Sequence, residues 1–329
     1  MTATYHDTVL DVYRKAAEAP AESLCCVAMP PQHLPGLHIP SIMHEMNYGC
    51  GSTVHSADMR KGQKVAYVGV GGGIEALQLA YYTRSPGGVI AVDPVAEMRE
   101  AARKNLDIAA ETNDWFDPSF VDIRDGDALD LPLDDAEVHL AAQNCLFNIF
   151  KSSPDAAGGG DLEKAMAEMH RILKPAGVLV MSDPIAPRPI PQHLREDERL
   201  RAECLSGCLS YEDYVRSIVD AGFGQLEIRS RRPYRLLDAA GHGMEEDLLL
   251  ETIEVAAYKT PVAEDGACVF TGRTALWSGE GERFDDGRGH VLQKGLPLPV
   301  CDKTAAALAS TPGVTITDPT WHFAGGGCC

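Results

Sequence analysis

Hydrophobic and polar residues alternate along the first two thirds of the chain in two distinct patterns. Some apolar runs are short and continuous, as in buried strands, whereas other stretches repeat small and apolar residues at helical spacing. The runs at 64–68, 89–92, 120–123, 138–142 and 178–181 predict five strands, and the stretches at 76–80, 95–110 and 162–173 predict helices between them. This alternation predicts an α/β fold with a doubly wound, mostly parallel sheet covered on both faces.

The pattern divides the chain into three expected parts. Residues 1–60 form an N-terminal segment that carries cysteines, and residues 61–230 form the α/β domain. Residues 231–329 form a small, mainly β domain, because short β-like runs at 267–270, 274–277 and 314–317 are separated by glycine-rich turns. The last five residues, Gly-Gly-Gly-Cys-Cys, predict a mobile tether that carries two thiols.

Composition excludes several classes of partner. The chain has 329 residues, with 48 acidic and 29 basic side chains and a formal charge of -19, which repels nucleic acid and anionic lipid. No apolar run is long enough for a membrane span, and the first ten residues lack a signal-peptide pattern. We therefore expect a cytoplasmic monomer without nucleic-acid or membrane partners. In a reducing compartment, its ten cysteines are expected to act as ligands or redox groups rather than as permanent disulfides.

A glycine-rich turn follows the first predicted strand. Gly69, Gly71 and Gly73 stand in Gly-Val-Gly-Gly-Gly before a helix, where backbone N–H groups can approach a ligand closely. Asp93 ends the second strand, 20 residues after Gly73, and can accept hydrogen bonds from both hydroxyls of a ribose. The combination predicts a nucleoside site, although the glycines alone are compatible with an ordinary tight turn.

Later polar residues favour S-adenosylmethionine over a dinucleotide. Asp127 and Ala128 follow the third strand and Asn144 follows the fourth, where methyltransferases hold the adenine and the methionine half; Asp127 is also compatible with a solvated loop. Two positions before the first glycine, where such enzymes usually carry an acid, this chain has Tyr67. Glu75, at the start of the next helix, is the candidate substitute.

Three cysteines stand beside this predicted site. Cys145 follows Asn144 at the carboxyl edge of the sheet, Cys50 precedes the first strand, and Cys204 follows the fifth. Since free cysteine is often a buried small hydrophobe, Cys268 and Cys301 are expected to be packing residues. His33, His38, His44 and His55 lack a ligand spacing, and no cysteine pair has the C-x-x-C spacing of a zinc or thioredoxin-like site.

The cysteine motifs resemble those of the arsenite S-adenosylmethionine methyltransferases, which have the Rossmann-like class I methyltransferase fold. The similar motifs are Cys25-Cys26, Tyr48-Gly49-Cys50-Gly51, Asn144-Cys145, Ser182-Asp183 and Glu203-Cys204-Leu205-Ser206-Gly207, in family order between about Leu24 and Phe223. Trp321-His322-Phe323 and the terminal Cys328-Cys329 further resemble the branch associated with arsenosugar biosynthesis. Tyr67 and Cys208 depart from the family pattern.

The resemblance implies a methyltransferase that acts on trivalent arsenic held by Cys50, Cys145 and Cys204. Arsenic(III) is soft and forms three pyramidal bonds, so three thiolates suit it, and its lone pair can then attack a methyl group held in line. The expected substrates are arsenite, methylarsenite or their thiol conjugates, with glutathione or thioredoxin as reductant. Additional arsenic-binding or disulfide-forming thiols are expected among Cys25, Cys26, Cys208, Cys328 and Cys329.

Two other functions are compatible with the sequence. A methyltransferase for oxygen, nitrogen or carbon would need a positioned acid or base and would have no use for the cysteines. A non-catalytic protein that binds arsenic or another soft metal would have lost the methyl donor, a possibility that Tyr67 raises.

Overall fold

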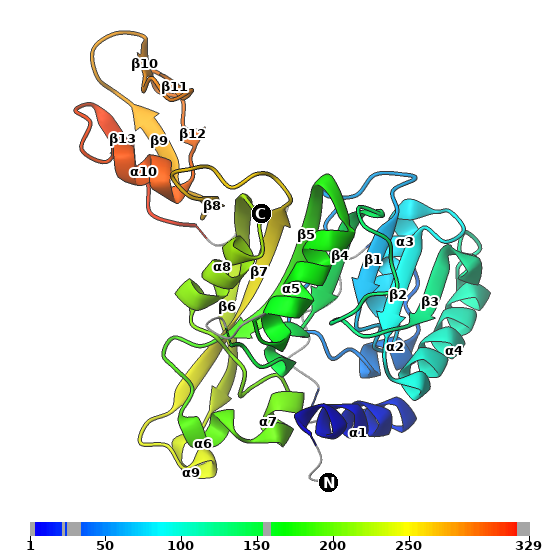
Figure 1. Cartoon of the computed structure of the whole chain (residues 1–329). Helices are drawn as coiled ribbons and strands as arrows, with labels where there is room; N and C mark the ends of the chain where they lie inside the picture. The colour runs from blue at the N-terminus through cyan, green and yellow to red at the C-terminus, as the bar shows by residue number, and fades with distance from the viewer. Residues whose placement is uncertain (1–3, 22–23, 25–33, 154–158, 321–329) are drawn as a thin grey trace.

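The computed structural model describes the chain except residues 1–3, 22–23, 25–33, 154–158 and 321–329. Its main body is an eight-stranded sheet with the order β3-β2-β1-β4-β5-β7-β6-β8 (Figure 1). The strands of this sheet are β1 (Val65–Val68), β2 (Val89–Asp93), β3 (Val121–Asp125), β4 (Val138–Asn144), β5 (Leu173–Ile185), β6 (Gln225–Leu237), β7 (Leu248–Tyr258) and β8 (Cys268–Phe270). The helices of the body are α1 (Tyr5–Glu18), α2 (Ser41–Glu45), α3 (Ile74–Thr83), α4 (Ala96–Thr112), α5 (Asp161–Ile172), α6 (Gln192–Arg195), α7 (Glu198–Ala202), α8 (Tyr211–Asp220) and α9 (Ala239–His242), with short 3₁₀ turns η1 (Pro118–Phe120) and η2 (Phe147–Ile149).

The central strands are buried on both faces of the sheet. All four residues of β1 are buried, and β1 pairs in parallel with β2 on one side and β4 on the other. Because successive side chains point to opposite faces, Ala66 and Val68 enter one apolar core while Val65 and Tyr67 enter the second. Continuous apolar runs are typical of such strands. The predicted α/β fold with a mostly parallel sheet is thereby confirmed.

Helices cover the two faces as their apolar spacing predicts. Leu162, Met166 and Met169 lie on one side of α5 and enter the first core, together with residues of α8. The buried side of α4 enters the second core with residues of α3. Both cores meet at β1 and β4, so the loops at the carboxyl ends of these strands are anchored from two sides.

The sheet continues past the expected domain boundary at residue 230, which falls within β6. β7 runs antiparallel between β5 and β6 and pairs with both over most of its length. β8, expected in the small C-terminal domain, pairs in parallel with β6. Residues 229–232 are mostly arginine, so this part of β6 has no apolar strand pattern in the sequence. Pairing with β7 holds it in the sheet instead.

The residues after β8 form a small separate unit, drawn in orange and red in Figure 1. β9 (Thr274–Trp277) pairs with β12 (Leu298–Pro299) and β13 (Val314–Ile316), and β10 (Arg283–Asp285) pairs with β11 (Val291–Gln293). Helix α10 (Asp302–Leu308) completes a core of its own around Trp277. Among all the residues that the structure describes, every helix lacks the length and apolarity that a membrane crossing demands.

Candidate active site

The glycine turn between β1 and α3 has a backbone that only glycine adopts easily. Gly69, Gly71 and Gly73 have positive φ angles of 85°, 50° and 87°, a region that other residues rarely occupy. Gly72 packs so closely that an added Cβ would lie 2.6 Å from the Cβ of Met46. The turn therefore places glycine peptide groups at the carboxyl end of β1.

Asp93 lies beside this turn at the end of β2. Its carboxylate accepts the N–H groups of Val70 at 3.0 Å and Val95 at 2.9 Å. Burial raises the pKa of Asp93 to about 6. A carboxylate offers about four lone-pair positions, so acceptor capacity remains beside the glycine turn. The arrangement fits the ribose of a nucleoside cofactor, which stays a prediction for Asp93 and the three glycines.

Tyr67 and Glu75 occupy the other end of the turn. The Tyr67 hydroxyl donates to the Glu75 carboxylate, which also accepts the N–H and hydroxyl of Thr53 at 3.1 and 2.7 Å. Burial raises the pKa of both Tyr67 and Glu75. A carboxyl group is thus present near the position where methyltransferases usually carry an acid, but it comes from α3 instead of β1.

Asn144 connects the N-terminal segment to the end of β4. Its side-chain oxygen accepts the N–H of Cys50 at 2.9 Å, and its amide donates to the carbonyl of Gly51 at 2.9 Å and to Glu75 at 3.2 Å. Gly49 must be glycine here, because a Cβ would lie 2.3 Å from the Asn144 nitrogen. Cys50 is thereby fixed at the carboxyl edge, next to the residues of the turn.

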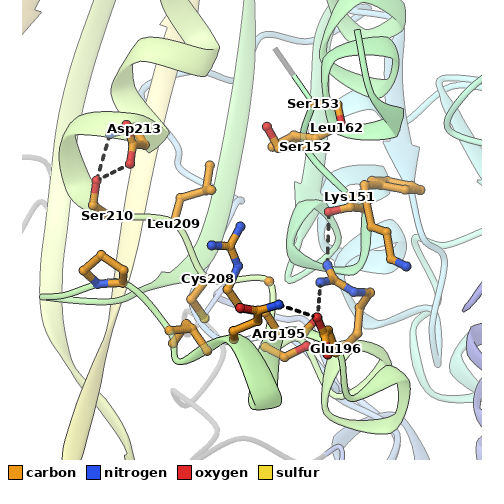
Figure 2. Close-up of a pocket in the computed structure, with 17 residues that line it drawn as sticks. Lys151, Ser152, Ser153, Leu162, Arg195, Glu196, Cys208, Leu209, Ser210 and Asp213 are labelled. Atoms are coloured by element: carbon orange, nitrogen blue, oxygen red, sulfur yellow. Dashed lines mark hydrogen bonds between the residues drawn. The ribbon is translucent and has the colours of Figure 1, made fainter. Parts of the chain in front are cut away.

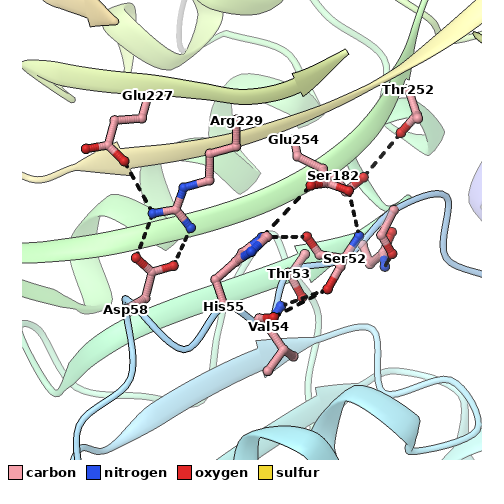
Figure 3. Close-up of polar contacts among 12 residues, drawn as sticks. Ser52, Thr53, Val54, His55, Asp58, Ser182, Glu227, Arg229, Thr252 and Glu254 are labelled. Carbon is pink, nitrogen blue, oxygen red and sulfur yellow. Dashed lines mark hydrogen bonds and ion pairs between the residues drawn. The ribbon is translucent and has the colours of Figure 1, made fainter. Parts of the chain in front are cut away.

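Further polar contacts hold the same segment to β6 and β7 (Figure 3). Ser52 donates its N–H to Glu254 at 3.0 Å. Asp58 forms a buried bidentate ion pair with Arg229 of β6. The N-terminal segment is therefore held to the sheet by side chains of β4, β6 and β7.

Four cysteines, Cys50, Cys145, Cys204 and Cys208, form what we call the cysteine group. All four are buried in the first core. Backbone and side-chain contacts join them in sequence: the Cys50 sulfur lies 3.5 Å from the Ser182 hydroxyl, and the Ser182 carbonyl accepts the N–H of Cys145 at 2.7 Å. The Cys204 thiol donates to the Cys145 carbonyl at 2.7 Å, and the Cys208 thiol to the Cys204 carbonyl at 3.4 Å.

The cysteine group shares a region without forming a preformed ligand set. Within the described residues, no three His, Cys, Asp or Glu side chains converge as a metal centre would require. Capture of a three-coordinate centre would need side-chain rotation, at least for Cys204, whose thiol points to a carbonyl. Cys145 and Cys204 have φ angles of 61° and 59°, and such backbone strain at non-glycine residues clusters at functional sites.

The other predicted residues lie apart from the cysteine group or outside the described part of the chain. Cys268 and Cys301 neighbour each other where β8 meets α10, and the pKa of Cys268 is raised by burial and by Cys301. Asp127 is exposed and accepts the N–H of Leu129, while Ala128 is buried. Cys25, Cys26, Cys328 and Cys329 lie outside the described residues, as do His33 and the Trp-His-Phe tail motif.

Asp183 is a buried residue that sequence reasoning did not place in the site. Its carboxylate accepts from Tyr214 at 2.7 Å, from the N–H of Phe147 at 3.2 Å, and from the amide of Gln143. Burial raises its pKa to about 7. Because Gln143 and Phe147 flank Cys145, Asp183 fixes the loop that carries this thiol. An acid two positions after the apolar run 178–181 was the available signal.

Comparison with known proteins agrees with this geometry. A methyltransferase domain model matches residues 66–181. An arsenite methyltransferase from Aquipseudomonas alcaligenes is 28% identical over 93% of this chain and 88% of its own length. An arsenite methyltransferase from Halobacterium salinarum is 28% identical over 56% of this chain, which covers 43% of that protein.

A solved structure extends the similarity to the fold as a whole. The crystal structure of an arsenic(III) S-adenosylmethionine methyltransferase from Chlamydomonas reinhardtii superposes with a TM-score of 0.62 at 25% identity, covering 90% of this chain and 99% of that one. The strand order, the glycine turn and these relatives together define an S-adenosylmethionine-dependent methyltransferase. Within that class, the chain is similar over most of its length to the arsenite methyltransferase of Aquipseudomonas alcaligenes and to the arsenic(III) methyltransferase of Chlamydomonas reinhardtii.

Proposed function

We propose that this enzyme transfers a methyl group to trivalent arsenic bound by Cys50, Cys145 and Cys204. The observation that carries the proposal is the contact between the Cys204 thiol and the carbonyl of Cys145. Cys145 follows Asn144, whose amide donates to Glu75 just after the glycine turn. S-adenosylmethionine, when bound, supplies an electrophilic methyl group. Gly69, Gly71, Gly73 and Asp93 are the residues that would hold it, with Asp127, Ala128 and Asn144 at the adenine and methionine ends.

The protein residues bind and orient the arsenic. Three thiolates suit a soft pyramidal centre and would leave its lone pair pointing away from the sulfurs, available to attack the methyl group that S-adenosylmethionine would supply. The buried surroundings of the cysteine group exclude water, and positioning of the two reactants supplies much of the rate. No general base takes part, because the lone pair is already available. The substrates are arsenite, methylarsenite or their thiol conjugates.

Cys208 and a cellular thiol complete the proposed cycle. Methylation of the arsenic lone pair would leave the arsenic formally pentavalent, and a disulfide formed by Cys208 with Cys204, which it contacts, would supply the two electrons that return it to the trivalent state. Glutathione or thioredoxin would restore the reduced state. The enzyme would act in arsenic detoxification or, as its tail motif suggests, in arsenosugar biosynthesis.

The test is a methylation assay with arsenite, glutathione and S-adenosylmethionine, followed by arsenic speciation. We expect Cys145→Ser and Cys204→Ser to lose methylation, because a hydroxyl is a hard ligand. Cys268→Ser, whose thiol lies in the C-terminal region, is the matched control and should retain it. Undiminished methylation in the first two variants would overturn the three-thiolate proposal.

Binding calorimetry with S-adenosylmethionine separates the alternatives. A chain that binds arsenite but no methyl donor would be a sequestering protein. A chain that methylates an oxygen, nitrogen or carbon acceptor independently of its cysteines would be a methyltransferase of another small molecule.

A further inference from the structure

A cavity of about 590 Å³ is lined by one member of the cysteine group, Cys208. Its walls come from the segment after η2, from α6 and α7, and from residues 206–210 before α8. Figure 2 shows Lys151, Arg195, Cys208 and Asp213 around it. The proposed methyl transfer uses none of the charged side chains in this cavity.

Three cations line the cavity in a chain with a strongly negative net charge. They are Lys151, Arg195 and Arg201. Arg201 is only 6% exposed and donates to two backbone carbonyls, those of Phe150 at 3.4 Å and Arg195 at 2.8 Å. Burial lowers the pKa of Arg201, and the charge of Arg195 contributes in the same direction. Among the described residues, no ion pair includes Lys151, Arg195 or Arg201.

The charge of Glu198 acts on Arg201 without forming an ion pair with it. Burial of such a guanidinium is costly, since desolvation of an ion is repaid mainly by a charge partner in contact. The carboxylates that also line the cavity are already engaged. Asp213 pairs with Arg216 at 3.0 Å and accepts from Ser210 at 2.9 Å, and Glu196 accepts from Gln192 at 2.8 Å. The cavity is therefore suited to an anion that arrives from outside, and arginine is the side chain best matched to carboxylate.

Cys208 joins this cavity to the cysteine group. It lines the cavity, and its thiol donates to the carbonyl of Cys204. The adjacent wall is closely packed, because a Cβ on Gly207 would lie 1.9 Å from the carbonyl oxygen of Asn148.

We propose that this cavity binds a small thiol that carries carboxylates, with its sulfur toward Cys208 and its carboxylates on Arg195 and Arg201. The choice of a sulfur ligand rests on the proposed function. Arsenic would pass between ligand and protein by thiol exchange: one As–S bond to the small thiol breaks, one As–S bond to a cysteine forms, and the proton of the cysteine goes to the departing thiol. No oxidant or reductant is consumed.

The experiment measures binding of S-methylglutathione to the reduced full-length protein by calorimetry, without arsenite or methyl donor. This probe has the carboxylates but cannot exchange or oxidise. We expect saturable binding that weakens about tenfold in Arg195→Ala, the loss of one charged hydrogen-bond partner. Arg195 is exposed, so the variant should fold. Arg288→Ala, an exposed arginine in the C-terminal unit, is the control and should bind as wild type.

A second measurement uses catalysis. In the methylation assay, KM for glutathione should rise in Arg195→Ala, whereas the rate supported by 2-mercaptoethanol, which lacks carboxylates, should not change. Absence of saturable S-methylglutathione binding, or equal binding by wild type and Arg195→Ala, would overturn the inference while leaving the proposed function standing. Binding of the probe by a protein that methylates no arsenic would overturn the proposed function alone.

Discussion

The thiol of Cys204 donates to the backbone carbonyl of Cys145 over 2.7 Å, although 59 positions separate the two residues in the chain. Both have left-handed backbone conformations, which cost about 1–2 kcal/mol for residues with a Cβ. Both residues therefore have a strained backbone, Cys145 just after the end of β4 and Cys204 just after α7. In these conformations the two cysteine-bearing segments lie in contact.

This strain can be separated from the chemistry at Cys204. Cys204→Ala and Cys204→Gly both remove the sulfur, so both should lose arsenic methylation. Glycine destabilises the folded protein because it has greater conformational entropy in the unfolded chain. At this position the effect is offset, because glycine adopts the positive φ without strain. We expect Cys204→Gly to be at least as stable as Cys204→Ala in urea unfolding. A glycine variant less stable than the alanine variant by about 1 kcal/mol or more would contradict strain of the size given above.

Glu75 should support the N-terminal closure by accepting four hydrogen bonds. In Glu75→Gln, the amide nitrogen would face one of the donors from Tyr67, Thr53 or Asn144, leaving a buried polar group unsatisfied. The expected loss in unfolding free energy is about 1–3 kcal/mol, with weaker S-adenosylmethionine binding. Glu111→Gln, at an exposed position of α4, should change neither. Unaltered stability and binding in Glu75→Gln would show that the contact is dispensable.

The main sheet and the position of Asp93 could be predicted from sequence because their signals are local. Mainly apolar runs of four or five residues mark the central strands, and an acid at a strand end falls at the sheet edge whatever the details of packing. The contact between Tyr67 and Glu75 could be predicted for the same reason. The two residues are only eight positions apart, so the end of β1, the glycine turn and the start of α3 bring them together locally.

Features built from distant segments could not be predicted in the same way. The pairing of β6 with β7 forms a strand over a charged sequence, so β6 runs through the predicted boundary at residue 230. The contact of Cys208 with Cys204 and the cations around Arg201 depend on how η2, α6 and α7 pack together, and no local period encodes that packing. Asp183 belongs to the Ser182-Asp183 motif in the sequence, but its role in fixing the Cys145 loop follows only from its partners in the fold.

Binding of S-adenosylmethionine should depend on pH through Asp93. The pKa of this carboxyl is raised to about 6 in the folded protein, so it is ionised above that pH and protonated below it. Ribose hydroxyls donate to the ionised form, and affinity should therefore be highest above pH 6 and fall by up to about tenfold per pH unit below it. Calorimetric titrations between pH 5 and 8 provide the measurement. Asp93→Asn should bind weakly and without this dependence, and the same pH profile in both proteins would assign the effect to another group.

Stability should also depend on pH, through Asp183. Its pKa is raised from 3.8 to about 7 by burial, so over this interval the folded state retains a proton that the unfolded state has released. Unfolding free energy should then decrease as pH rises from about 4 to about 7 and level off above that range.

Asp93 acts in the same direction over the lower part of the interval, so the test compares wild type with a variant of Asp183. In Asp183→Asn, which cannot ionise, urea unfolding at pH 5 and pH 8 should show a smaller difference than in wild type, although the variant loses an acceptor for Tyr214 or Gln143 at both values. An equal or larger difference in the variant would mean that Asp183 is already ionised in the folded protein at pH 5, and that its three donors, rather than burial, set its pKa.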